Sequence, residues 1–248
     1  MPFLDLFSEV SDCYRLIRPH YPEALFARCA DLAPARVQAW DCATGNGQAA
    51  VGLTPFFDRI QATDASATQI AHAIAHERIV YSVAPAESSG LPAASVDLVT
   101  VAQALHWLDR PRFYAEARRV MKPDGIIAVF GYTWFYISPE LDALIDELLL
   151  RPAAPYWLPN SQLLWDGFRT VEFPFEELPP PRLAIHLHWN LEQVLRYYLS
   201  SSGPRAAIKA LGEKFLRAAE QRLREAWGNP TRTLPVVMPL GIRLGRNR

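Results

Sequence analysis

The sequence contains little cysteine: three residues among 248, Cys13, Cys29 and Cys42, none with metal-ligand spacing. So few cysteines, odd in number, argue against a disulfide framework and favour a reducing compartment. Hydrophobic residues make up 50% of the chain and charged residues 21%, so we expect a packed core rather than disorder. The length suits one large α/β domain, or one such domain with an appended cap.

Long hydrophobic runs and a surplus of charge are also missing. The longest uncharged apolar run, 126–137, is too short to cross a bilayer, and the net charge of −1 attracts neither nucleic acid nor an anionic membrane. The amino terminus carries Asp5, Glu9 and Asp12 where a signal peptide would carry lysine or arginine. We therefore expect a cytoplasmic protein without a membrane partner.

The carboxyl-terminal segment 203–248 is locally basic, with ten Arg or Lys against three Glu. Two interpretations stay open, a nucleic-acid-binding patch and the solvated face of a helix. Because Glu213, Glu220 and Glu225 are interspersed with the arginines, the pattern favours the solvated face. We do not expect nucleic acid as a partner.

The most informative stretch is 37–47, V-Q-A-W-D-C-A-T-G-N-G. Its first half is an apolar segment of strand length, its second half is a turn of small residues, and helical spacing follows. This arrangement builds the crevice in which α/β sheets hold nucleotide-like ligands. Gly45 and Gly47 allow positive φ and close approach of a ligand, and Asp41 could meet a cationic amine.

Strand-like and helical segments alternate along the chain, which predicts parallel strands with right-handed crossovers. The strand-like segments are 37–42, 58–64, 78–84, 96–102, 125–132, 168–178 and 234–244. The helical segments are 5–17, 22–32, 47–57, 66–77, 111–121, 139–150, 190–201 and 205–227. We predict an α/β fold: a doubly wound, Rossmann-like, mostly parallel seven-stranded sheet with one antiparallel edge strand and a small helical cap.

We expect one domain with four parts. They are amino-terminal lid helices (1–34), a cofactor-binding core (35–132), cap and substrate-side insertions (133–202), and a carboxyl-terminal helix and edge strand (203–248). Ligands of such folds bind beyond the carboxyl ends of the strands. The first four strands deliver polar residues there: Asp41, Asp64, Ala86-Glu87, and Gln103 with His106-Trp107. Asp64 follows Gly47 by 17 residues, where a carboxylate could accept bonds from two ribose hydroxyls.

An ordered series of motifs carries a resemblance to a known family. The motifs are D-C-A-T-G-N-G (41–47), A-T-D-A-S (62–66), A-E-S-S-G-L-P-A-A-S-V-D-L-V-T (86–100), A-Q-A-L-H-W-L-D (102–109) and A-R-R-V-M-K-P-D-G (117–125). The chain resembles class I S-adenosylmethionine-dependent methyltransferases, of the small-molecule branch related to ubiquinone-biosynthesis and trans-aconitate methyltransferases. The resemblance covers residues 1 to about 132, and extends more weakly to 189–202.

The resemblance implies S-adenosylmethionine as the cofactor, with a role for each strand end. Asp41 with Gly45 and Gly47 would hold the methionine part, Asp64 the ribose, and Ala86 with Glu87 the adenine edge. The remaining implied cofactor contacts are Ala43, Thr44, Gln48, Ala65, Ala102 and Gln103. The sequence departs from the family at two positions, where Ala43 replaces a loop glycine and Pro85 replaces an acid near the adenine.

Methyl transfer from a sulfonium is an in-line displacement, so the protein must mainly align the acceptor and exclude water. His106 is the candidate base or acceptor ligand, although it could instead only pack beneath its loop. Trp107 could wall the reaction chamber. Tyr14 and Arg18 resemble a family element that closes over the cofactor, and Arg18 could also pair with an acceptor carboxylate.

A group of aromatic residues in 134–165 could form an apolar cap over a hydrophobic or aromatic small-molecule acceptor, or could simply be core. They are Trp134, Phe135, Tyr136, Tyr156, Trp157 and Trp165. Two histidine pairs lack a third ligand with recognisable spacing, so we expect no metal. His72 and His76 are four apart on a predicted helix, and His186 and His188 alternate on one face of a strand.

Other functions stay open. Residues 45–50 satisfy G-x-G-x-x-A, as in an NAD-dependent oxidoreductase, but Asp41 would repel a pyrophosphate and the chain has no Tyr-x-x-x-Lys pair. An RNA or protein methyltransferase and an inactive cofactor-binding protein are further alternatives. The leading hypothesis is an enzyme that methylates a small molecule on oxygen, carbon or nitrogen.

Overall fold

The computed structural model describes residues 19–248, and its centre is a sheet of buried strands. The sheet forms because strands such as 96–102 are apolar and β-branched enough to be covered on both faces. Its order is β3 (Ile79–Val83), β2 (Arg59–Asp64), β1 (Gln38–Cys42), β4 (Val96–Ala102), β5 (Met121–Tyr132), β8 (Leu234–Arg246) and β6 (Glu176–Leu178). The pairs from β3 to β5 are parallel, whereas β8 runs antiparallel to both β5 and β6.

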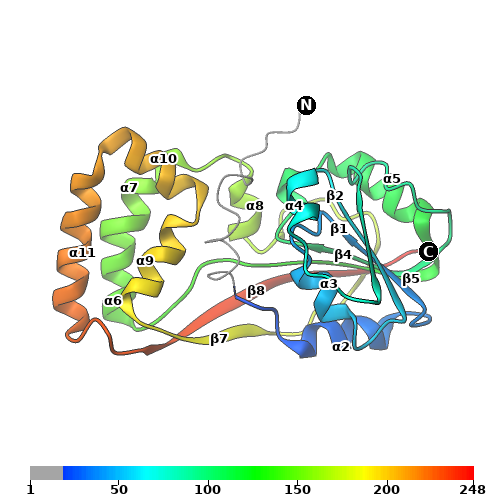
Figure 1. The fold of residues 1–248 in the computed structure, drawn as a ribbon, viewed down its shortest axis with the longest axis horizontal. Coiled ribbons are helices and arrows are strands. Elements are labelled where there is room, and N and C mark those ends of the chain that lie inside the picture. The colour runs from blue at the N-terminus through cyan, green and yellow to red at the C-terminus, as the bar shows by residue number, and fades with distance from the viewer. Residues whose placement is uncertain (1–18) are drawn as a thin grey trace.

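The predicted fold class is confirmed, with one addition and one refinement. An eighth strand, β7 (Ala184–Trp189), pairs with the first half of β8, from Leu234 to Pro239. The antiparallel strand β8 lies between β5 and β6 rather than at the edge, because its second half pairs on both sides. The long red strand in Figure 1 therefore belongs to two parts of the molecule, the core sheet and the cap.

Helices cover both faces of the sheet, as a doubly wound fold requires. The helices of the core are α2 (Glu23–Leu32), α3 (Gln48–Leu53), α4 (Ala67–Ala71) and α5 (Arg110–Val120). Apolar residues of α2 and α3, such as Phe26 and Leu53, pack in one buried cluster with Phe130 of β5. Phe113 of α5 packs in a second cluster with Trp40 of β1. The right-hand part of Figure 1 shows this layered core.

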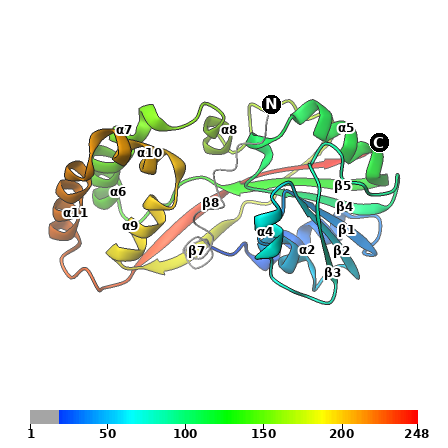
Figure 2. The same ribbon diagram turned by 45° about the horizontal axis from the view of Figure 1, so that its top comes forward.

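The cap has an apolar core of its own beside the sheet (Figures 1 and 2). Its elements are α6 (Pro139–Ile145), the π-helical turn η3 (Asp146–Leu150), α7 (Arg151–Ala153), the 3-10 turn η4 (Ala154–Tyr156), α9 (Leu191–Leu199), α10 (Ser202–Leu211) and α11 (Glu213–Trp227). Tyr198, Leu223 and Trp227 are buried among these helices. A short helix, α8 (Ser161–Trp165), lies between the cap and the core in both views.

Several predicted segments differ from the structure; the helix expected over 47–57, for example, ends at Leu53, and the one expected over 139–150 continues as a π-helical turn after Ile145. The helix expected over 66–77 ends at Ala71, because the chain turns to cover the glycine turn, where Ile74 N–H donates to Asn46 O. The strand expected over 168–178 is reduced to 176–178, because its first residues form a turn: Phe168 has a φ of +63° and its carbonyl accepts a bond from the N–H of Val171. The helix expected over 205–227 is divided at Gly212, whose φ is +79°.

Some predictions concern residues outside the described part of the chain. The helix expected over 5–17 lies there, as do Cys13, Tyr14 and Arg18. Within residues 19–248, none of the helices combines the length and the apolar character needed to cross a bilayer.

Candidate active site

Asp41, the next-to-last residue of β1, is completely buried and forms hydrogen bonds to the turn that follows the strand. Its carboxylate accepts hydrogen bonds from the hydroxyl of Thr44, at 2.5 Å, and from the hydroxyl of Thr100 on β4, at 2.7 Å. The backbone N–H of Ala50, in the first turn of α3, also donates to it. The prediction was that Asp41 meets a ligand amine directly, whereas the structure places two hydroxyl groups against it.

Burial raises the pKa of Asp41 from its ordinary value of 3.8 to about 6. The bonds from Thr44, Thr100 and Ala50 offset part of that rise, while the nearby charge of Asp64 adds to it. Asp41 therefore remains ionised at neutral pH and takes up a proton in mild acid. Its negative charge is available to stabilise a cation at the turn.

The turn between β1 and α3 depends on left-handed backbone conformations. Gly45 has a φ of +57° and Gly47 a φ of +89°, as the sequence predicted. A Cβ on Gly47 would lie 2.1 Å from the hydroxyl oxygen of Tyr81, which itself donates to Ile74 O. Ala43 also has a positive φ, +54°, at the position where the family carries glycine. A positive φ of this kind costs alanine more than glycine.

Asp64, at the end of β2, ties the second strand to the same turn. Its two carboxylate oxygens accept bonds from the N–H of Gly45 and the N–H of Ser66, each at 2.8 Å. Both acids therefore meet at one turn, Asp41 through Thr44 and Asp64 directly. Of the other predicted cofactor residues, Ala65 follows Asp64, Gln48 begins α3 and Ala102 ends β4.

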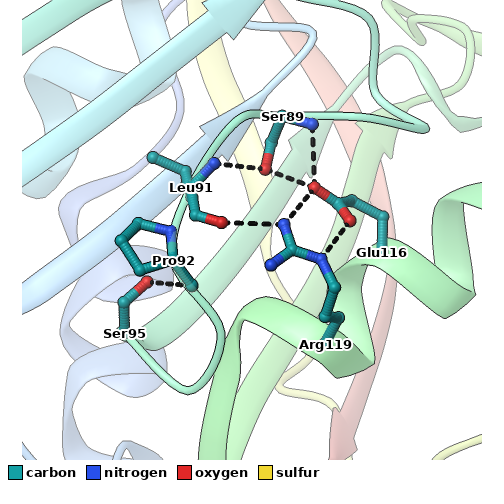
Figure 3. A network of polar contacts seen from close by, with 6 residues as sticks. All are labelled: Ser89, Leu91, Pro92, Ser95, Glu116 and Arg119. Carbon is teal, nitrogen blue, oxygen red and sulfur yellow. Dashed lines mark hydrogen bonds and ion pairs between the residues drawn. The ribbon is translucent and has the colours of Figure 1, made fainter.

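The segment after β3, which carries Ala86 and Glu87, is fixed by helix α5. Glu116 of α5 accepts bonds from the N–H and the hydroxyl of Ser89, at 2.8 Å and 2.5 Å, as Figure 3 shows. Arg119 pairs with Glu116 at 2.7 Å and donates to Leu91 O. Glu87 itself accepts a bond from the N–H of Asp109.

The Arg119 guanidinium, with the Ser89 groups, lowers the pKa of Glu116 from 4.5 to about 2, although burial opposes the shift. The sequence motifs did not include Glu116. A signal was present, because Glu116 is an acid between Phe113 and Ala117 on the apolar, core-facing side of a predicted helix. A charged residue at such a position requires a partner.

The end of β4 delivers Gln103 and His106 to the other side of the site. Gln103 has a φ of +56°, and its side-chain amide donates to Tyr132 O at 3.3 Å, while its Oε1 is buried without a hydrogen-bond partner. His106 lies in the 3-10 turn η2 (Leu105–Trp107) with 8% of its surface exposed, and its ring packs against Trp107. Its Nδ1 is also buried without a partner, and burial lowers its pKa to about 4. The imidazole is therefore neutral at physiological pH.

A pocket of about 80 Å³ joins the end of β4 to the cap. Four predicted site residues line it: Gln103, His106, Trp107 and Trp134. Residues around α8 and at the junction of α9 with α10 complete the wall; they include Trp157, Ser161, Trp165, Tyr197, Ser200, Ser201 and Ser202. At this volume the pocket can hold part of a small acceptor but not a nucleoside cofactor as well.

The pocket and the glycine turn lie at the ends of two neighbouring strands, because β1 pairs with β4 in the sheet. Asp41 pairs in register with Thr100, three residues before Gln103. The geometry thus separates a turn with two acids from an aromatic pocket, at the carboxyl ends of adjacent parallel strands. Two ligands that react with each other could be held in this way.

Comparison with known proteins decides the family. A family model described as a methyltransferase domain matches residues 40–129. A solved structure from Anaeromyxobacter dehalogenans, of a protein assigned as a type II methyltransferase, is 43% identical, covers 93% of this chain and 98% of its own, and has a TM-score of 0.88. The chain belongs to the class I S-adenosylmethionine-dependent methyltransferases.

Curated relatives agree with this family. A Dictyostelium discoideum protein assigned as a methyltransferase is 29% identical over 91% of this chain and 87% of its own length. Methyltransferase pgmE of Aspergillus terreus is 28% identical over 72% of this chain and 62% of its own. The enzyme class predicted from the motifs is therefore confirmed, and the narrower branch stays a prediction.

The residues at the turn of this methyltransferase fit S-adenosylmethionine. Asp41 and Asp64 place two carboxylates at Gly45, where a Cβ would meet only Gln69 Oε1, at 3.9 Å. Two acids beside such an open approach suit a ligand with an ammonium and a sulfonium group, and would repel the pyrophosphate of NAD.

The aromatic residues predicted to form a cap over the acceptor fall into two groups in the structure of the methyltransferase. Trp134, Trp157 and Trp165 line the pocket. Phe135 is buried in the cap core, Tyr156 packs against that core, and Tyr136 is 53% exposed. The serines at 200–202 and Tyr197 were not predicted, although a run of three serines after an amphipathic helix was a signal that could have been followed.

The side chains of His72 and His76 have hydrogen-bond contacts within their own segment of the methyltransferase. His72 contacts Thr68 O through its ring nitrogen, and His76 accepts a bond from the N–H of Arg78. Across 19–248 no three His, Cys, Asp or Glu side chains are grouped to hold a metal ion.

Proposed function

We propose that this enzyme transfers the methyl group of S-adenosylmethionine to a small molecule held in the pocket between β4 and the cap. The observation that carries the proposal is the adjacency of the acidic glycine turn and the aromatic pocket, at the ends of neighbouring strands β1 and β4. Membership in the family indicates S-adenosylmethionine as the cofactor, and the bound cofactor supplies an activated methyl group. The protein must align the acceptor and exclude water.

Each side of the site has its own task in this proposal. Asp41 acts through its charge and through Thr44, which it positions, on the methionine ammonium. Asp64 receives the ribose, and the segment of Ala86 and Glu87 borders the adenine. His106, neutral and buried, accepts a hydrogen bond from the acceptor. In this division 35–132 holds the cofactor, and the insertions within 133–202 supply most of the acceptor side.

The basic carboxyl-terminal region gives little support to a nucleic-acid substrate. Three arginines of α11, at 217, 222 and 224, form ion pairs with Glu213, Glu147 and Glu220. Their charges are thus used within the protein, which favours the solvated face over a phosphate-binding patch.

Thermal unfolding tests the cofactor directly. A ligand at about 100 times its dissociation constant stabilises a protein by about 2.7 kcal/mol, which is several degrees for a chain of this size. We expect such a shift with S-adenosylmethionine and with S-adenosylhomocysteine, and none with NAD(H). A shift with NAD(H) and none with the two adenosyl-sulfur ligands would overturn the proposal.

A further inference from the structure

The pocket described above contains no fixed charge among the residues that the structure describes. Asp, Glu, Lys and Arg are all missing from its lining within 19–248, and its histidine is neutral because burial lowers the pKa of His106 to about 4. A carboxylate or ammonium group placed here would lose its hydration without gaining a counter-charge. The lining therefore disfavours charged acceptors.

The walls of the pocket are mostly aromatic. Four tryptophans, at 107, 134, 157 and 165, line it together with Tyr197. Trp157 and Trp165 meet edge to face with their ring centroids 5.0 Å apart. Aromatic walls in this number favour a planar ring, since offset and edge-to-face contacts stabilise ring pairs beyond their buried area.

Buried polar atoms without partners are concentrated at the same place. Gln103 Oε1, His106 Nδ1 and Trp157 Nε1 are on side chains that line the pocket, and none has a hydrogen-bond partner. Leaving such an atom unpaired costs about 1–3 kcal/mol. A ligand that pairs with them would recover this energy. Because Gln103 Oε1 only accepts and Trp157 Nε1 only donates, a ligand that pairs with both atoms must both donate and accept hydrogen bonds, and a hydroxyl group can do both.

Two glycines make room for these side chains. A Cβ on Gly131 of β5 would lie 2.3 Å from Gln103 Oε1, and a Cβ on Gly203 of α10 would lie 2.4 Å from the ring of Trp157. Both contacts are too short for any other residue unless the neighbour moves. Glycine at these two positions therefore leaves the space that the side chains of Gln103 and Trp157 occupy.

We propose that the pocket selects an uncharged aromatic acceptor and methylates its hydroxyl group, an inference that rests on the methyltransferase function proposed above. A phenolic hydroxyl donates and accepts hydrogen bonds, and its ring matches the aromatic walls. The hydroxyl oxygen forms a bond to the methyl carbon while the carbon–sulfur bond breaks, and sulfur keeps the electron pair. The hydroxyl proton moves to His106 Nδ1 and then to water, which leaves a neutral methyl ether.

A matched series of acceptors tests the class. Catechol is neutral, 3,4-dihydroxybenzoate adds a carboxylate, dopamine adds an ammonium group, and cyclohexane-1,2-diol removes the aromatic ring. We expect kcat/KM for catechol to exceed each of the others at least about tenfold, a difference of about 1.4 kcal/mol. The inference is overturned if a charged analogue or the alicyclic diol reacts as well as catechol.

Calorimetry with S-adenosylhomocysteine separates this inference from the proposed function. If the chain does not bind S-adenosylhomocysteine, the proposed function itself fails. If it binds, but catechol neither reacts nor binds to the complex, only the acceptor class is wrong. Binding of catechol to the complex can be followed by the fluorescence of the pocket tryptophans.

Two variants sharpen the test. Trp157→Phe keeps a ring and removes the buried N–H, so we expect KM for catechol to rise several-fold while the Kd of S-adenosylhomocysteine is unchanged. The matched variant Trp165→Phe, at a partly exposed position, should change KM less. Gln103→Glu places a carboxylate in the pocket and should shift the kcat/KM ratio of dopamine to catechol upward about tenfold. Equal effects of the two tryptophan variants, or an unchanged ratio, would contradict the inference.

Discussion

The two sides of the site differ in how their polar groups are paired. At the glycine turn, Asp41 accepts a hydrogen bond from Thr44, and Asp64 accepts hydrogen bonds from the N–H groups of Gly45 and Ser66. The polar groups of the turn are therefore paired without a ligand. In the pocket, Gln103 and His106 each keep a buried atom without a partner. A cofactor shared by a whole family suits a preformed turn, whereas the unpaired atoms leave the hydrogen bonds of the acceptor side to its ligand.

The first prediction concerns a variant that disrupts the glycine turn, the side of the site whose polar groups are already paired. Gly47→Ala places a Cβ against Tyr81 at a φ of +89°, so it adds a clash to backbone strain. We expect a loss of about 3 kcal/mol or more of unfolding free energy, measured by urea denaturation, together with loss of S-adenosylmethionine binding.

Gly90→Ala is the matched control, because Gly90 has a φ of +75° but open space around its Cβ position. That variant should lose only about 1 kcal/mol from strain. Similar losses in the two variants would mean that the contact between Tyr81 and Gly47 does not stabilise the turn.

The glycine turn was predicted from the sequence better than the pocket was. The signals of the turn, from Asp41 to Ser66, lie in one short stretch, and glycine and acid at those positions have few alternative meanings. The pocket brings together Gln103, Trp157 and Ser200, which only the folded cap places side by side. Tyr136 and Trp157 look alike as aromatic residues in the sequence, yet one is exposed and the other lines the pocket.

The same limit applies to the sheet. The parallel strands were predicted because each crossover leaves a local pattern of strand, turn and helix. The position of β8 between β5 and β6 depends on pairing between segments more than 60 residues apart, and an apolar segment carries no mark of its neighbours. The alternation of His186 and His188 indicated a strand, but its place in the sheet beside β8 was missed for the same reason.

The second prediction concerns the unpaired side. His106→Asn should lower kcat by about 100-fold and leave the Kd of S-adenosylmethionine unchanged, because His106 lines the pocket proposed to hold the acceptor. Since its pKa is about 4, its own titration should leave kcat constant between pH 6 and 8. An inflection in the wild-type pH–rate profile near 6.5 that disappears in the variant would show that His106 titrates as an exposed histidine does.

The third prediction uses the charge of Asp41. Asp41→Asn keeps the shape and removes the charge, so we expect the Kd of S-adenosylmethionine at pH 8 to rise about tenfold. Wild-type affinity should fall as the pH drops below about 6, where Asp41 is protonated, while the affinity of the variant stays level. Titration calorimetry at several pH values gives both results.

The stability of the wild-type protein should change with pH in the opposite direction to its affinity for S-adenosylmethionine. The pKa of Asp41 is raised by folding, so its contribution to stability is full below about pH 4 and is lost as the pH rises through about 6. The variant does not titrate here, so its unfolding free energy relative to the wild type should increase from pH 4 to pH 7. A difference that decreases over this range would show that the carboxylate is stabilised by folding.

The last prediction tests the network by which α5 anchors the segment that carries Ala86 and Glu87. Glu116→Gln removes the charge that holds Arg119 and Ser89, in the network of Figure 3. Because Arg119 is 43% exposed, we expect a loss of only about 1–2 kcal/mol at pH 7, with a several-fold weaker affinity for S-adenosylmethionine. The pKa of Glu116 is lowered by folding, so its contribution is present above about pH 4.5 and is lost as the pH falls through about 2.

The destabilisation by Glu116→Gln should therefore shrink as the pH falls towards 2. Glu220→Gln is the control, because Glu220 pairs with Arg224 on the exposed face of α11 and should cost less than about 0.5 kcal/mol. Equal losses for the two variants at pH 7 would place the Glu116 network among ordinary surface ion pairs. A larger loss at Glu116, together with weaker cofactor binding, would show that α5 fixes the segment after β3 and that this segment contributes to cofactor binding.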